Sequence, residues 1–217
     1  MRKVFGIPLE KELIHIPTGF LTLTTGKMSS RKGNVLTGES ILEEMQEASL
    51  KKAASSRAEN IEELGEMVAV AALKYQILKH GIGAKIVVDK EKALSFEGDS
   101  GPYIQYTQAR IGSVITKAAE VGVHPSIVHL PEVAYDVEKI VCRFEEVVKD
   151  AAQECEPQKV VTYLTQLAGM FNTFYAHEKI ADVQDELAPY KLLLAEAVQQ
   201  TLRNGLWVLG IKAPERM

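Results

Sequence analysis

A short run of cations and hydroxyls near the N-terminus contains the residue types that bind polyphosphate. The segment at positions 26–34 reads G-K-M-S-S-R-K-G-N, and the glycines near its ends allow the backbone to bend close to a ligand. Lysine and arginine neutralise phosphate charge, while hydroxyls and backbone amides donate directed hydrogen bonds. The candidate loop residues are Lys27, Met28, Ser29, Ser30, Arg31 and Lys32. A solvated basic turn between a strand and a helix is the structural alternative.

The order of these residues resembles the KMSKS loop of class I aminoacyl-tRNA synthetases, which typically reads K-M-S-K-S-R-G-N. Five residues match position for position: Lys27, Met28, Ser29, Gly33 and Asn34. The resemblance implies that the loop binds ATP, with Mg²⁺ carried on the nucleotide, and that Lys27, Ser29 and Lys32 act in catalysis. Ser30 stands where the family has its second lysine, and Arg31 or Lys32 is the available substitute.

A second segment, S-F-E-G-D-S-G-P-Y-I-Q-Y at positions 95–106, reads as a turn followed by a helix with Pro102 in its first turn. Packing and capping alone would account for its polar and aromatic residues. The segment closely resembles one found in the arginine-specific synthetases, where an A-R pair follows, here Ala109-Arg110. The ending L-G-I-K-A-P-E-R-M resembles the C-terminus of the same enzymes. Residues 185–188 lie near the place of their DALR-type signature, from which Ala188 departs.

The resemblance implies that the helical part binds the anticodon arm of tRNA. Aromatic side chains can stack on unpaired bases, and cations can contact phosphate. The candidate tRNA-binding residues are Asn172, Tyr175, His177, Lys179, Arg203, Trp207 and Met217. Each has a structural alternative. Trp207 follows Leu206 in a helix, which favours a core position, and Arg203 and Lys179 suit a solvated face.

The elements that would position these residues are mainly helices. Apolar residues recur at the helical period through six stretches, which predict a mainly α fold, a helical bundle of the DALR-like anticodon-binding type. The expected helices cover residues 38–54, 60–80, 102–115, 133–148, 160–175 and 186–210. Two short strands are expected at 13–16 and 20–24. We expect residues 1–57 to be a β/loop remnant of the catalytic domain and residues 58–217 to be the all-α domain.

Composition limits the possible classes of protein. Hydrophobic residues make up 46% of the 217, which excludes a disordered chain, and the net charge of −4 means that any nucleic-acid contact must use local cations. The sequence contains neither a signal peptide nor a membrane-length apolar run. Cys142 and Cys155 lack metal-ligand spacing, so no metal site is expected and a reducing, cytoplasmic setting is favoured.

Three functional interpretations follow. The first is the C-terminal portion of an arginine-tRNA ligase without the HIGH-bearing catalytic domain, serving ATP-dependent attachment of arginine to tRNA-Arg. The second is a free-standing, non-catalytic tRNA-binding module, and the third is a purely structural bundle. Three matching segments in the right order exclude the third. Under the first interpretation, the expected partners are tRNA-Arg, arginine and ATP, and the intact enzyme is expected to be a monomer. The oligomeric state of the fragment stays open, and the fragment alone is expected to be inactive.

Overall fold

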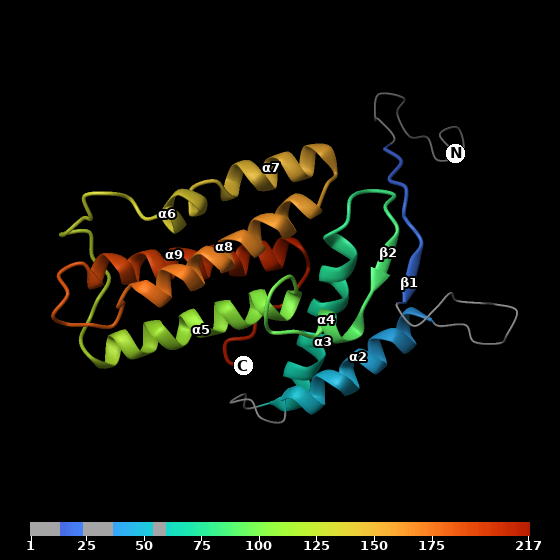
Figure 1. Cartoon of the computed structure of the whole chain (residues 1–217), viewed down its shortest axis with the longest axis horizontal. Coiled ribbons are helices and arrows are strands. Elements are labelled where there is room, and N and C mark those ends of the chain that lie inside the picture. The colour runs from blue at the N-terminus through green and yellow to red at the C-terminus, as the bar shows by residue number, and fades with distance from the viewer. Residues whose placement is uncertain (1–13, 24–36, 54–59) are drawn as a thin grey trace, which may run out of the picture.

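The protein is mainly α-helical, as the sequence predicts (Figure 1). The computed structural model describes residues 14–23, 37–53 and 60–217. In chain order the elements are β1 (Leu21–Leu23), α2 (Gly38–Ala53), α3 (Ile61–Leu78), β2 (Ile86–Val88), α4 (Lys90–Ala93), α5 (Gly101–Glu120), α6 (Asp136–Val141), α7 (Phe144–Glu154), α8 (Gln158–His177) and α9 (Ala188–Val208).

The first elements form a small layer with a core of its own. Strands β1 and β2 pair in parallel, with Leu21 opposite Ile86 and Leu23 opposite Val88. A parallel pair needs a long crossover, and α2 and α3 provide it. The buried residues of this layer are Ile41, Met45, Leu64, Val68, Ala69, Ala72, Val88, Ala93 and Leu94. Helix α2 therefore shares its core with α3.

The strand predictions are only partly confirmed. Strand β1 lies within the expected 20–24 stretch, but Ile14 and Ile16 are exposed and belong to no strand. Strand β2 was not predicted from the sequence. It contains only three residues and is held by a partner more than sixty positions away, so no local pattern could reveal it.

Helices α2 and α3 approach closely because Gly65 has no side chain. A Cβ at this position would lie 2.6 Å from Cδ2 of Leu50. The hydroxyl of Ser49 also donates to the Gly65 carbonyl at 2.9 Å. As predicted, Asn60 caps α3, its side-chain oxygen accepting from the Glu63 amide at 3.1 Å.

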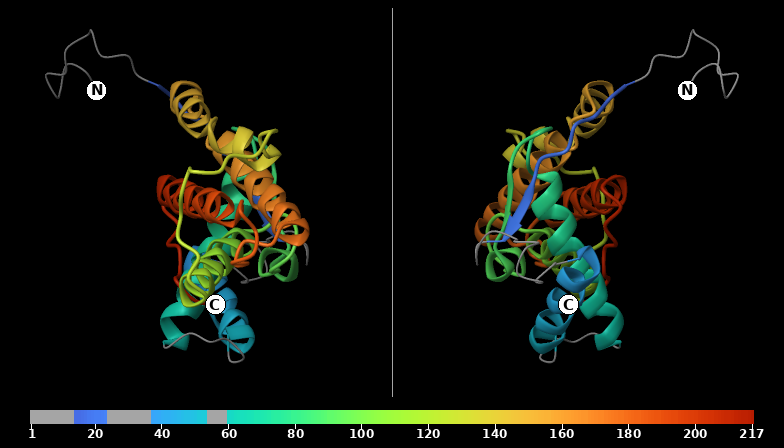
Figure 2. Two further views of the ribbon diagram at one scale, coloured as in Figure 1. Left: turned by 90° about the vertical axis from the view of Figure 1, so that its left-hand side faces the viewer. Right: turned by 90° about the vertical axis from the view of Figure 1, so that its right-hand side faces the viewer.

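The main core lies among α5, α8 and α9, with α6 and α7 packed along α8. In Figure 2, α8 and α9 lie side by side with α5 below them, so the three helices enclose a core that is triangular in cross-section. The largest side chains that are fully buried there include Ile104, Ile111, Leu164, Leu167, Phe171, Leu192, Leu202 and Leu206. These residues come from the predicted apolar stripes, which confirms the helical-bundle prediction.

The predicted helix 133–148 is wrong in detail, because the chain forms α6 and α7 with a break at Cys142 and Arg143. The buried Tyr163 of α8 explains the break. Its hydroxyl donates to the carbonyl of Ile140 at 3.1 Å and lies 3.5 Å from that of Val141. A continuous helix would use these carbonyls for its own amides.

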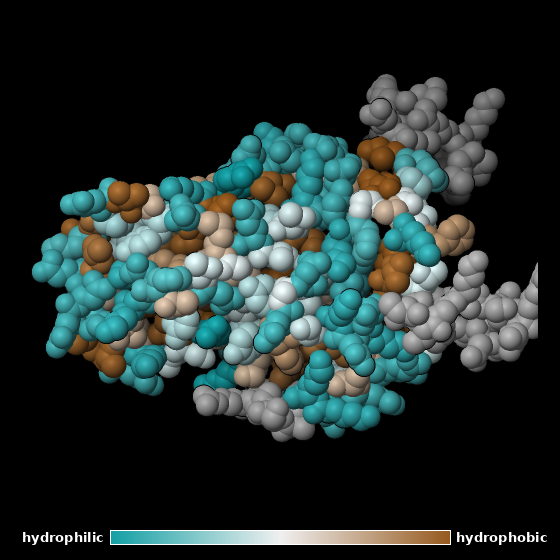
Figure 3. Space-filling model, in the orientation of Figure 1, coloured by the Kyte–Doolittle hydropathy of each residue, from teal (hydrophilic) through white to brown (hydrophobic). Residues whose placement is uncertain are grey.

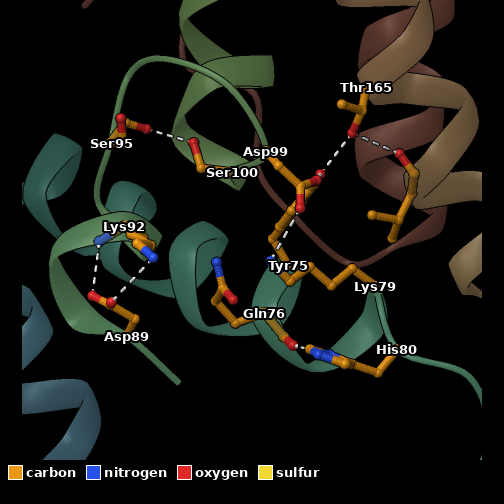
Figure 4. A network of polar contacts seen from close by, with 11 residues as sticks. Tyr75, Gln76, Lys79, His80, Asp89, Lys92, Ser95, Asp99, Ser100 and Thr165 are labelled. Carbon is orange, nitrogen blue, oxygen red and sulfur yellow. Dashed lines mark hydrogen bonds and ion pairs between the residues drawn. The ribbon is translucent and has the colours of Figure 1, made fainter. Parts of the chain in front are cut away.

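A polar network fixes the turn that begins α5 (Figure 4). The Tyr75 hydroxyl donates to Asp99 and lies 2.6 Å from the Thr165 hydroxyl, while Lys79 pairs with Asp99 at 3.1 Å. Burial and the bond to Asp99 raise the pKa of Tyr75 well above its ordinary value. Burial opposes ionisation of Asp99, but the Tyr75 and Lys79 donors outweigh it and hold the pKa of Asp99 below its ordinary value. The network thus ties α3, α5 and α8 together.

Candidate functional site

A polar and aromatic surface lies where α5 packs beside α8. We call it the α5–α8 surface and define it by Tyr103, Thr107, Arg110, Asn172 and Tyr175. The three α5 residues are four and three positions apart, which puts them on one face of the helix. The two α8 residues are three positions apart, so they also share one face of their helix. Their contacts with Tyr103, Thr107 and Arg110 show that this face is turned toward α5.

Asn172 is the centre of this surface. Its side-chain nitrogen donates to the Tyr103 hydroxyl at 2.9 Å and to the Thr107 hydroxyl at 3.2 Å. Its oxygen accepts from Arg110 at 3.5 Å. Both ends of the amide are therefore used, which fixes the side chain between the two helices.

Arg110 is the exposed part of the surface, and it lies over the half-buried ring of Tyr175. The guanidinium carbon lies 4.9 Å from the centroid of the Tyr175 ring, within cation–π range. Behind that ring, Phe171 is fully buried and stacks at 6.2 Å with an interplanar angle of 15°. With Phe171 on one face of the Tyr175 ring and Arg110 over the other, the exposed guanidinium is the group suited to stack on an unpaired base or to contact phosphate.

Arg110 was not among the residues predicted to bind RNA. It was recognised only as part of the Ala109-Arg110 pair, although the spacing of Tyr103, Thr107 and Arg110 marks one helix face. Tyr106 was missed in the same way. It is exposed by 40% on α5 and packs against Phe96 with ring centroids 6.2 Å apart.

His177 and Lys179 lie beyond this surface, near the end of α8. His177 lines a hollow of about 460 Å³ between α8 and the start of α6. Its Nδ1 lies 2.8 Å from the Thr173 carbonyl oxygen, which can only accept a hydrogen bond. Lys179 is exposed and lies 3.7 Å from the carboxylate of Asp182. Among the described residues, neither His177 nor Lys179 shares a hydrogen bond, ion pair or ring contact with Tyr175 or Asn172.

The connection between α8 and α9 is held by the buried Lys191. Its ammonium pairs with Glu178 at 2.5 Å and with Asp185 at 2.7 Å, at the two ends of the connection. Burial opposes the charge on Lys191, but the two carboxylates outweigh it and raise its pKa above the ordinary value. The bond from Lys191 is the main reason that the pKa of Asp185 is lowered. This pairing gives the segment near the expected DALR-type signature a structural role.

Arg203 and Trp207 lie on α9, apart from the α5–α8 surface. Both line a hollow of about 510 Å³ between α9, α3 and the C-terminal tail. The core position considered for Trp207 is wrong, because 79% of the residue is exposed while its neighbour Leu206 is buried. Met217 packs against the α2–α3 layer. The seven candidates therefore do not form one contiguous contact network; their roles in RNA binding stay predictions.

The candidate ATP loop at positions 27–32 lies outside the described residues. The roles of Lys27, Met28, Ser29, Ser30, Arg31 and Lys32 therefore stay predictions. Within residues 14–23, 37–53 and 60–217, no group of three or more His, Cys, Asp or Glu side chains could hold a metal ion. Across the same ranges, no helix is long and apolar enough to cross a membrane.

The chain folds into a helical bundle with an aromatic and cationic surface along α5 and α8. The family model of the DALR anticodon binding domain matches residues 104–217, which is more than half of the chain. The chain therefore belongs to the DALR anticodon-binding domain family.

The similar proteins are arginine-tRNA ligases. The chain is 33% identical to the arginine-tRNA ligase of Borrelia hermsii over 98% of its own length and 38% of the relative's. It is 36% identical to that of Thermococcus kodakarensis over 94% of the chain and 34% of the relative. The solved structure of Thermus thermophilus arginyl-tRNA synthetase matches with a TM-score of 0.78 at 28% identity, covering 92% of the chain and 35% of the synthetase. The chain thus spans between a third and two fifths of the length of these relatives.

Proposed function

We propose that the chain is the tRNA-binding part of an arginine-tRNA ligase and that its helical bundle binds the anticodon arm of tRNA-Arg. The observation that carries the proposal is the α5–α8 surface, in which the exposed Arg110 lies over the rigid Tyr175 ring within a member of the anticodon-binding family. Anticodon bases are unpaired, so the guanidinium of Arg110, supported by the Tyr175 ring, can reach their faces and edges. The similarity to arginine-tRNA ligases over almost the whole chain supports arginine as the amino acid.

In the proposed interface, the α5–α8 surface recognises bases while exposed cations contact phosphates. The net charge of −4 gives the protein no general attraction for RNA, so binding must depend on such local groups. Arg110, Lys179 and Arg203 are exposed cations of this kind. The affinity should therefore fall with salt, by an amount that reflects the few phosphates that are contacted.

We further propose that the loop at positions 27–32 serves the ATP-dependent step. In this step the carboxylate of arginine attacks the α-phosphate of ATP, which gives arginyl-adenylate and pyrophosphate, and the arginyl group then passes to the 3′ end of the tRNA. Lys27, Ser29 and the Arg31-Lys32 pair would contact the triphosphate, and Mg²⁺ would accompany the ATP. Because the chain spans little more than a third of its relatives, we expect that it does not attach arginine alone.

The edge of the molecule near β1 offers a place where the rest of a ligase would pack. Four apolar residues are exposed there: Ile14 by 69%, Ile16 by 51%, Phe20 by 86% and Val87 by 43%. Figure 3 shows hydrophobic side chains at this end of a largely hydrophilic face. Exposed apolar groups of this kind mark interaction surfaces.

A chimera tests the proposal and its alternative, a free-standing tRNA-binding module. Residues 1–217 replace the matching region of the Thermococcus kodakarensis ligase, and ATP–pyrophosphate exchange measures adenylation. Lys27→Ala should slow adenylation far more than it weakens tRNA binding, whereas Arg110→Gln should do the opposite. A chimera that binds tRNA but in which Lys27→Ala leaves adenylation unchanged would contradict the role of the loop and favour the free-standing module.

A further inference from the structure

The hollow at the C-terminal end of α9 contains the only tryptophan of the chain. Trp207 is 79% exposed, which forfeits the stabilisation that burying an indole would give. The volume of about 510 Å³ falls within the range of small-molecule sites. The lining residues are Met67, Arg203, Trp207, Gly210, Ile211, Lys212, Ala213 and Glu215.

The walls of this hollow are held firmly by the fold. Gly210 ends α9 with a φ of +66°, and the Ile211 amide donates back to the Leu206 carbonyl at 2.8 Å. The tail is then fixed twice, because Lys74 donates to the Gly210 carbonyl and the Gln105 side chain donates to that of Lys212 at 2.7 Å. The hollow is therefore preformed and needs no rearrangement of the tail to receive a ligand.

The chemistry of the lining matches a nucleotide better than an apolar partner. Trp207 offers an aromatic face, and Met67 and Ala213 add apolar surface. Arg203 and Lys212 supply positive charge, and neither makes an ion pair with any residue in the described part of the chain. Glu215 adds a carboxylate that can accept from the amino group of a base.

We propose that this hollow is a subsite for one unpaired nucleobase of the bound RNA, separate from the α5–α8 surface. The base stacks on Trp207, and Arg203 and Lys212 attract the adjoining phosphates. The subsite rests on the proposed function, because it requires an RNA partner. Stacking on an aromatic ring tolerates any base, so the subsite strengthens binding without setting the choice of tRNA.

Because Trp207 is the only tryptophan, its fluorescence reports directly on the hollow. The chain is titrated with tRNA-Arg, with a single-stranded oligonucleotide and with a fully paired RNA duplex, while the anisotropy of labelled RNA measures total binding independently. We expect tRNA and the single strand to quench Trp207 in step with binding. The duplex should leave the fluorescence unchanged, because its bases are already stacked and paired.

Two variants separate stacking from simple hydrophobic contact. Trp207→Phe keeps an aromatic ring and should bind RNA almost as well as the natural chain. Trp207→Leu keeps an apolar side chain and should bind about tenfold more weakly, the loss expected for one stacked base. Position 207 is exposed to solvent, so thermal unfolding of both variants should be nearly unchanged and serves as the control for folding.

The outcomes distinguish the subsite from the proposed function. If tRNA binds by anisotropy but neither quenches Trp207 nor loses affinity with Trp207→Leu, the subsite is wrong and the proposed function stands. If no tRNA binds, both are contradicted. If Trp207 fluorescence changes with protein concentration in the absence of RNA, a second copy of the chain covers the hollow and the subsite is again wrong.

Discussion

Replacement of Arg110 by glutamine separates a role in RNA binding from a role in folding. The guanidinium lies 4.9 Å from the Tyr175 centroid and 3.5 Å from the Asn172 oxygen. A cation–π contact at an exposed site is worth about 0.5–1 kcal/mol, and a hydrogen bond at the limit of the distance range adds little. The free energy of unfolding should therefore fall by no more than about 1 kcal/mol.

The effect on RNA binding should be larger. Loss of a guanidinium that stacks on a base or contacts phosphate should cost about 1–3 kcal/mol, or roughly 5- to 150-fold in affinity for tRNA. If the contact is to a phosphate, the slope of log K against log salt should also shrink by about 0.7. Urea denaturation measures the first effect, and anisotropy of labelled tRNA at several salt concentrations measures the second. Arg110→Lys is the matched control, because it keeps the charge but loses the planar group.

Two results would refute this reasoning. Unchanged tRNA affinity in Arg110→Gln would remove Arg110 from the interface. A loss of several kcal/mol in the free energy of unfolding would mean that Arg110 acts through the fold, so that any loss of binding would be indirect.

Three further predictions concern the scaffold. Phe171→Ala should lower the free energy of unfolding by about 3–5 kcal/mol in urea denaturation, because the ring is fully buried; a loss below about 1 kcal/mol would mean that the core is loosely packed there. Gly101→Ala should lower the free energy of unfolding by about 1–3 kcal/mol in the same assay, because the new Cβ would lie 2.4 Å from the Ala71 carbonyl oxygen. Gly38→Ala is the control and should be harmless, because nothing lies within 4 Å of its Cβ; equal effects of the two changes would contradict the close crossing of α3 and α5. Because the pKa of Asp99 is lowered in the folded protein, its ionised form contributes stability above about pH 4, and this stability is lost as the pH falls through the folded-state pKa. Asp99→Asn should therefore weaken the acid dependence of the free energy of unfolding. An unchanged dependence would mean that other carboxylates cause it.

Local patterns could predict most of the helices. The period of apolar residues and the Asn60 cap indicate α3, and Pro102 marks the first turn of α5. The features that were missed depend on distant partners. The break between α6 and α7 is fixed by the Tyr163 hydroxyl from α8, about twenty positions further along the chain.

The candidate site was less predictable than the fold. Tyr175 and Asn172 could be selected from the sequence, but their contact with Arg110 depends on how α8 packs against α5. The exposure of Trp207 was open to prediction, because Trp207 lies outside the apolar stripe that Val198, Leu202 and Leu206 form along α9. Successive residues of a helix lie about 100° apart around its axis, so the core position of Leu206 turns Trp207 toward solvent.

The central claim is that the helical bundle reads tRNA-Arg. Its most direct test is the affinity of the 217-residue chain for tRNA-Arg and for a tRNA of another amino acid, measured from about 50 to about 200 mM salt. We predict tighter binding of tRNA-Arg, with a preference that persists at the highest salt while both affinities fall. Equal affinities that both disappear as the salt rises would contradict the claim, because they would leave only non-specific attraction to phosphate.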